Sequence, residues 1–305
     1  MLLITGSGPQ DRDETILGHK PFLVLADYLT RRGIAVLRVD DRGVGGSTGN
    51  VREATSAHFA NDVLAGIDFL KTRQEINPKE IGLIGHSEGG IIAPLVASRS
   101  PDVAFIVMLA GTGLPGDEVL YLQGAALLRA AGADQKEIER QNAFQKRIFT
   151  LVRQEKGEAA EQKIREAMKD APSDGGGKDK KQPDEAVPML EGQVQTVLTP
   201  WFRHVLDYDP RPALRKTKCP VLALNGEKDL QVDPKINLKA IEEALKEGGN
   251  RDFTVKELPN LNHLFQTCKT GAVSEYSQIE ETLAPSALEI IADWIMKRTG
   301  GKVTR

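Results

Sequence analysis

The feature that most constrains this chain is the stretch Gly85–Gly89, which reads GHSEG and fits the pattern G-x-S-x-G. One apolar run precedes it at 81–84, and another follows at 91–96. When a strand, a sharp turn and a buried helix surround this pattern, the turn lifts the serine hydroxyl above the sheet edge. The N–H groups after the serine then point at an incoming carbonyl oxygen. We therefore predict that Ser87 is a nucleophile; the alternative is an ordinary glycine-rich turn.

Short apolar runs alternate along the chain with amphipathic helical patterns. Strands of a parallel sheet are buried on both faces, so they read as near-continuous apolar runs, and helices connect them. The sequence therefore predicts an α/β fold with a mostly parallel sheet of about six strands. The expected strands are Leu2–Thr5, Ala35–Asp40, Ile81–Gly85, Ala104–Ala110, Val221–Asn225 and Phe253–Leu258.

The strand–helix rhythm stops in the middle of the chain. Residues 1–112 and 213–305 form the predicted α/β core, and 113–212 form a predicted helical cap. Within the insertion, 172–183 is rich in Gly and Lys and has no apolar anchor, which predicts a mobile loop. Because the insertion lies between two core strands, we expect it over the sheet edge where ligands bind. The alternative is a solvent-facing insertion without a substrate role.

Composition argues against several kinds of partner. The chain has 305 residues and a formal net charge of −3, which gives no reason to expect nucleic acid or an anionic membrane as partner. It contains no apolar run long enough to span a bilayer. The first residues read as a buried strand rather than a signal peptide, so the expected location is cytoplasmic. Cys219 and Cys268 lack metal-type spacing and are expected to be reduced thiols.

A serine nucleophile needs a base and a third group that orients the base, and in this fold class they follow the serine as Asp or Glu, then His. Asp229 lies on the loop after the strand at 220–224, which favours it as the acid. Glu227 and Asp233 on the same loop are its competitors. The alternative for any of the three is a solvated loop carboxylate.

The base is predicted to be His263, which lies just after the strand at 253–258. The four other histidines fail the test of order and placement. Two precede the serine, one is its immediate neighbour and cannot reach around to it, and one belongs to the insertion; in that order these are His19, His58, His86 and His204.

Two backbone N–H donors are expected to form the oxyanion hole. One is that of Glu88, the residue after the nucleophile. The other is that of Ser7, with Gly8 next, on the glycine-rich loop after the first strand. A phosphate-binding loop is the rival interpretation, but neither of its usual patterns is present. The loop Asp40–Ser47 either lines the site or, as we favour, is braced by Arg42 and the two acids against the turn at Ser87, the nucleophile elbow.

Taken together, these segments resemble the serine α/β-hydrolase superfamily and, more narrowly, bacterial esterases and hydrolases of the serine aminopeptidase-like (S33-type) branch. The resemblance implies an α/β-hydrolase fold and carboxylic-ester hydrolysis without metal or cofactor, with Ser87 as nucleophile, His263 as base and Asp229 as its orienting acid. The segments that carry it are Gly6–Asp13, Asp40–Ser47, Gly85–Gly90, Asn225–Asp229 and Asn262–Gln266.

Two departures from the family pattern stand out. Thr5-Gly6 replaces the usual His-Gly before the oxyanion residue, which leaves a backbone donor undisturbed. The two strands that usually precede the first strand of this chain are absent, which leaves Ala35–Asp40 as a sheet edge. An exposed edge invites pairing with another chain. We therefore expect either a homodimer through this edge or a chain whose start lies inside a longer natural protein.

The expected function is that of a serine esterase (carboxylesterase), which cleaves small-molecule carboxylic esters through an acyl-enzyme on Ser87. A peptidase, thioesterase or lactonase would use the same triad. A non-catalytic binding protein of this fold is a further alternative. Four aromatic residues of the insertion are candidates for an acyl pocket, although core packing explains them as well: Phe144, Phe149, Trp201 and Phe202.

Overall fold

The computed structural model describes residues 1–172 and 183–300, without the side chains of 183–189, and contains a five-stranded parallel sheet. One row of paired residues crosses the whole sheet: Leu3, Ile84, Val107, Leu222 and Thr254. Because all strands are parallel, their carboxyl ends lie at one edge of the sheet. The prediction of a mostly parallel sheet is confirmed. In pairing order the strands are β1 (Leu2–Ile4), β2 (Gly82–His86), β3 (Phe105–Leu109), β4 (Val221–Gly226) and β5 (Phe253–Leu258).

The predicted strand at 35–40 is the one error in the sheet. Only Leu37 pairs with β1, through a parallel bridge to Leu2. The Leu37 N–H donates to the Met1 carbonyl at 2.8 Å, and its carbonyl accepts from the Leu3 N–H at 3.0 Å. β1 is only three residues long and offers few backbone partners, so the run does not continue as a strand. Val39, near its end, is 45% exposed.

Two helices cover one face of the sheet, and their apolar stripes form its main core. These are α1 (Pro21–Thr30) and α11 (Pro285–Met296), which contact each other. Leu25 of α1 and Ile291 of α11 are fully or almost fully buried in the same cluster as Val107 and Leu222 of the sheet. Each helix begins with a proline in its first turn, where the missing N–H leaves no hydrogen bond unmade. The buried residues of both helices therefore pack against this face of the sheet.

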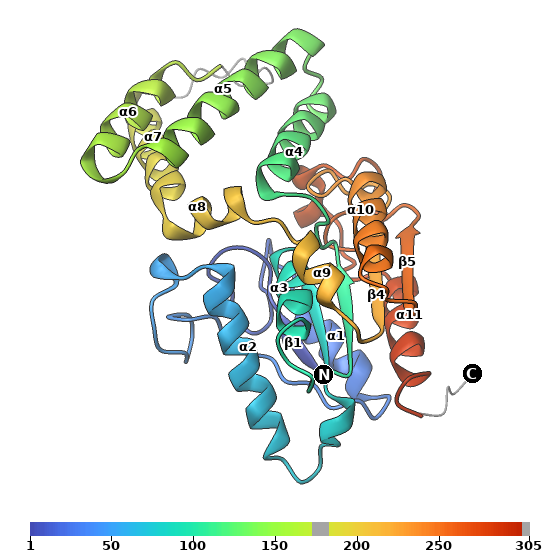
Figure 1. Cartoon of the computed structure of the whole chain (residues 1–305). Coiled ribbons are helices and arrows are strands. Elements are labelled where there is room, and N and C mark those ends of the chain that lie inside the picture. Colours follow the sequence, from blue (N-terminus) through green and yellow to red (C-terminus); the bar gives the residue numbers. More distant parts are fainter. Residues whose placement is uncertain (173–182, 301–305) are drawn as a thin grey trace. The chain divides into compact units, whose positions relative to one another are not determined.

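Four further helices belong to the same compact unit and contact one another or the strands. They are α2 (Ser56–Lys71), α3 (Glu88–Ala97), α9 (Arg211–Lys216) and α10 (Pro234–Glu247). α3 follows the G-x-S-x-G turn directly and is buried along nearly its whole length, as its continuous apolar sequence predicts. Figure 1 shows these helices and the strands of this unit. The described residues also form three short 3₁₀ helices, at Val51–Glu53, Pro78–Glu80 and Val273–Gln278.

Pro115–Tyr208, together with Arg52–Thr55, forms a second compact unit. This unit has a hydrophobic core of its own, to which Phe149 belongs. The centroid of the Phe149 ring lies 5.2 Å from that of Tyr121 and 5.9 Å from that of Phe202. Core packing therefore accounts for Phe149 and Phe202. The predicted loop at 172–183 lies, except for its two end residues, outside the described residues. The helices of this unit are α4 (Gly116–Ala130), α5 (Gln135–Gln154), α6 (Gly157–Lys169), α7 (Pro183–Leu198) and α8 (Pro200–Asp207).

Candidate active site

Ser87 occupies a strained turn between β2 and α3. Its φ is +53°, a left-handed conformation that a side-chain-bearing residue rarely adopts. Its N–H donates to the Leu109 carbonyl at the end of β3 over 2.8 Å, which fixes the turn to the neighbouring strand. A Cβ at Gly85 would collide with the Gly89 backbone, and one at Gly89 with the carbonyl of Ile4. The turn therefore requires the two glycines of the G-x-S-x-G pattern.

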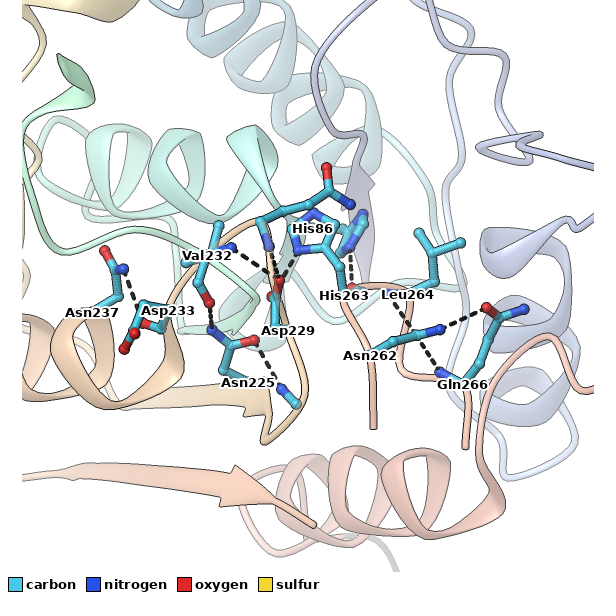
Figure 2. A network of polar contacts seen from close by, with 12 residues as sticks. His86, Asn225, Asp229, Val232, Asp233, Asn237, Asn262, His263, Leu264 and Gln266 are labelled. Atoms are coloured by element: carbon cyan, nitrogen blue, oxygen red, sulfur yellow. Dashed lines mark hydrogen bonds and ion pairs between the residues drawn. The ribbon is translucent and has the colours of Figure 1, made fainter. Parts of the chain in front are cut away.

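Asp229 and His263 meet on neighbouring loops after β4 and β5. The Asp229 Oδ2 lies 2.7 Å from His263 Nδ1 (Figure 2). Its other oxygen accepts the N–H groups of Gln231 at 2.8 Å and Val232 at 2.9 Å. Both residues are buried, with 4% and 5% of their surface exposed. Asp229 is thus held by two backbone donors and presents its remaining oxygen to the imidazole.

The two competing acids on the Asp229 loop have other partners. Asp233 caps α10, where its Oδ1 accepts the Ile236 N–H at 3.0 Å. Glu227 accepts the N–H of Asn260 at 2.8 Å and so ties the two loops together. The structure therefore brings only Asp229 of the three to His263.

The loop that carries His263 is shaped by Asn262 (Figure 2). The Asn262 Oδ1 accepts the N–H groups of Leu264 at 3.0 Å and Gln266 at 2.9 Å, and its amide donates to the Gln266 side chain at 2.9 Å. With Nδ1 bound to Asp229, His263 has Nε2 left for a reacting group. In the described part of the chain no hydrogen bond joins His263 to Ser87; apo sites often tighten this contact only when substrate binds.

Two other histidines of this unit, His19 and His86, have partners that suit structural roles. His19 lies between the Thr282 hydroxyl and the Tyr276 carbonyl, each at 2.9 Å. His86 bonds Glu14 and the carbonyl of His263, each at 3.0 Å. Neither ring nitrogen of His86 is directed to Ser87, in agreement with the sequence argument.

The loop after β1 lies against Ser87. A Cβ at Gly6 would come within 3.3 Å of the Ser87 Cβ. The Gly6 N–H is already bound to Glu14 Oε1 at 2.7 Å, so it is not available to an oxyanion. Ser7, the next residue, is exposed, and its carbonyl accepts the Gln10 side chain. Glu88 begins α3, whose N-terminal N–H groups favour negative charge. The N–H groups of Ser7, with Gly8 next, and of Glu88 stay the predicted donors.

Asp40 and Asp41 stabilise the loop that follows β1 rather than the turn at Ser87. Asp40 binds the Arg12 guanidinium at 2.6 Å, and this hydrogen bond, aided by backbone donors, holds the pKa of Asp40 well below its usual range. Asp41 accepts the Thr5 hydroxyl at 2.8 Å and the Gln10 N–H at 3.0 Å. Burial outweighs these bonds and raises the pKa of Asp41 to about 6.

Arg42 has a different role from its two acidic neighbours, because it pairs with Asp62 of α2. The predicted bracing therefore reaches the loop at 6–14 and helix α2, and not the turn at Ser87.

Sequence reasoning missed Glu14. It ends the run Asp11–Glu14, which reads as a charged, solvated loop, yet only 3% of Glu14 is exposed. Its φ is +54°, which turns the side chain inward beneath the loop. No local pattern marks this burial, since it depends on β2 and on the loop after β5.

Neither cysteine pairs with the other. Both are free, and burial raises the pKa of Cys219 to about 11, so it is a thiol at neutral pH. Among residues 1–172 and 183–300, no cluster of His, Cys, Asp and Glu has the make-up of a metal site. Over the same residues, none of the helices combines the length and apolar character needed to cross a membrane.

The sequence is similar to known proteins. The family described as serine aminopeptidase, S33, matches residues 20–145, which include the Ser87 turn. Esterase EstD of Thermotoga maritima is 26% identical over 300 residues, covering 97% of this chain. The chain spans 62% of the length of that esterase.

Solved structures share the fold at low identity. The Pyrococcus furiosus esterase PF2001 aligns over 97% of this chain and 81% of its own, with TM-score 0.55 and 16% identity. The α/β hydrolase GrgF of Penicillium sp. sh18 aligns over 98% and 90%, with TM-score 0.56 and 16% identity. The chain therefore has the α/β-hydrolase fold of these structures, and its sequence is similar to the serine aminopeptidase, S33, family and to an esterase.

The contrast between two acids of one loop gives a first prediction. Asp229→Asn removes the charge that orients His263, and we expect the rate of Ser87 labelling by a fluorophosphonate to fall by about 10⁴-fold. Asp233→Asn changes a helix cap on the same loop and serves as the matched control, with labelling close to wild type. Equal loss in both variants, measured by intact mass over time, would contradict the assignment.

The buried Asp41 gives a second prediction, on stability. Its pKa is about 6 in the folded chain and is expected near 3.8 when unfolded, so the folded state keeps the proton longer. The free energy of unfolding contributed by Asp41 therefore falls as pH rises from about 4 to about 6. In denaturant unfolding across this pH window, we expect the free energy of unfolding of Asp41→Asn to increase relative to that of wild type as pH rises. A difference that is constant with pH would refute the assignment.

Proposed function

We propose that the protein is a serine hydrolase that cleaves carboxylic esters through an acyl-enzyme on Ser87, which makes it a carboxylesterase. The observation that carries this proposal is the buried 2.7 Å bond between Asp229 and His263, on loops at the sheet edge where β2 delivers Ser87. The similarity to Esterase EstD supports the choice of esters. The substrate is proposed to be a small molecule.

In the first half-reaction, His263 Nε2 takes the proton of the Ser87 hydroxyl while the oxygen attacks the ester carbonyl carbon. Asp229 holds the Nδ1–H and stabilises the imidazolium that forms. The tetrahedral intermediate then breaks its bond to the alkoxy oxygen, which receives the proton from His263. The alcohol leaves, and the acyl group remains on Ser87.

In the second half-reaction, water gives its proton to His263 and attacks the acyl carbon. The bond to Ser87 breaks, the proton returns to the serine oxygen, and the acid is released. In both halves the carbonyl oxygen carries negative charge, and the proposed donors are the N–H groups of Ser7 and Glu88. Donors fixed in place before the reaction stabilise this charge strongly, typically by about 10²–10³-fold in rate for each donor.

A peptidase is the second candidate, and the matched family description is the observation that favours it. Thioesters and lactones undergo the same acyl transfer, because they differ only in the leaving group. A fold of this kind hosts many chemistries, so the leaving group must be determined by experiment. A non-catalytic binding protein would predict a broken triad, whereas Asp229 and His263 are bonded here.

We further propose that Pro115–Tyr208 acts as a cap that selects the substrate. The support is topological, since the segment is inserted between β3 and β4, whose carboxyl ends border the candidate site. It also has its own buried core and can therefore present a defined surface.

Ser87→Ala tests the proposed nucleophile. We expect the variant to lose about 10³-fold or more of kcat on short p-nitrophenyl esters, because it lacks the hydroxyl that would carry the acyl group. Ser277→Ala, an exposed serine far along the chain, is the control and should turn over at the wild-type rate. If Ser87→Ala hydrolyses esters at the wild-type rate, the proposal is wrong.

A further inference from the structure

Beneath the Ser87 turn lies a buried pair that the acyl-transfer steps do not use. Glu14 and His86 are 3% and 7% exposed, and Glu14 Oε1 lies 3.0 Å from His86 Nδ1. The surroundings are apolar, with Phe22, Leu109 and Phe265 among the residues that line a small cavity beside the pair. Polar groups buried in this way are costly unless they are paired.

The hydrogen bonds around His86 determine where its protons are. Nε2 faces the carbonyl of His263 at 3.0 Å, and a backbone carbonyl can only accept, so Nε2 carries a proton. Nδ1 faces Glu14 Oε1, which also accepts the Gly6 N–H at 2.7 Å. An oxygen that accepts from two nitrogens suits an ionised carboxylate. With Glu14 ionised, both ring nitrogens of His86 face acceptors.

We propose that His86 is an imidazolium ion paired with an ionised Glu14, and that this pair is the positioning device that joins the loop after β1 and the loop of His263 to the nucleophile turn. The pair touches all three segments: Glu14 binds Gly6, His86 adjoins Ser87, and His86 binds the His263 backbone. Glu14 and His86 do not touch the reacting atoms, so they are positioning residues.

The charged groups that face His86 agree with this assignment. Burial alone would lower the pKa of His86, but the attraction and hydrogen bond of Glu14, the His263 carbonyl and the charge of Asp229 together raise it. The His263 ring lies 5.0 Å from the His86 ring, and Phe265 adds an edge contact at 6.4 Å. The His86 ring is therefore close enough to His263 for its charge to act on the proposed general base through space.

The protonation state can be measured in the wild-type protein by nitrogen-15 NMR of the histidine rings at neutral pH. We expect His86 to show two protonated ring nitrogens, with its signals identified by their absence from His86→Gln. A His86 ring with one unprotonated nitrogen would overturn the proposal. This measurement uses no substrate, so it stands or falls separately from the esterase proposal.

The positioning role is tested with Glu14→Gln, and this arm rests on the proposed function. A glutamine oxygen can accept the same two hydrogen bonds but carries no charge to stabilise the His86 imidazolium, so we expect kcat for a p-nitrophenyl ester to fall by about 10²-fold with KM nearly unchanged. The acid limb of the pH profile of kcat/KM is expected to move as well, since His86 loses its charge. Glu280→Gln, an exposed carboxylate, is the matched control.

Several outcomes separate the alternatives. Wild-type kcat and an unmoved pH profile in a folded Glu14→Gln protein would refute the positioning role. Loss of kcat with an unmoved pH profile would indicate a merely structural contact and would also refute it. Absence of ester turnover in wild type, together with a doubly protonated His86, would refute the esterase proposal and leave the ion pair intact.

Discussion

The parallel direction of all five strands is the constraint on which the candidate site depends. It brings the carboxyl ends of β1, β2, β4 and β5 to one edge, so that the loops with Ser7, Ser87, Asp229 and His263 become neighbours although they lie far apart in the sequence. The row of paired residues from Leu3 to Thr254 sets the height of each strand in the sheet. A slip of one residue in any pairing would displace one functional loop relative to the others.

Much of this architecture is readable from sequence because its causes are local. Continuous apolar runs predict the buried strands, and the glycines around Ser87 predict a turn that only small residues permit. The run at 35–40 gave a wrong prediction, since apolar character alone does not reveal that β1 offers too few backbone partners. The burial of Glu14 was not predicted, because it depends on segments that are remote in the sequence. A charged residue in a polar loop is expected to be solvated. Asp229 could be preferred to Asp233 because of its position after a strand. Only the structure shows that the Asp233 side chain accepts the Ile236 N–H as the N-cap of helix α10.

Strain and compensation occur together at this edge. Ser87 and Glu14 both have positive φ values, and such conformations persist only where neighbouring contacts outweigh their cost. For Ser87 those contacts are the bond to Leu109 and the close approach of α3; for Glu14 they are the bonds to Gly6 and His86. The polar groups near the nucleophile thus form a connected set, with Asp40 and Asp41 holding the outer part of the same loop. We infer that the set keeps the backbone donors in place before a substrate arrives, which is the condition for efficient oxyanion stabilisation.

The proposed mechanism requires Ser87 to carry an acyl group during turnover. The most direct test is to mix the protein with a p-nitrophenyl ester, quench with acid during turnover, and measure the intact mass followed by peptide mapping. We expect the mass to increase by one acyl group less one hydrogen atom, on the peptide that contains Ser87. Ester turnover without a covalent adduct under conditions that slow deacylation, or an adduct on a different residue, would contradict it.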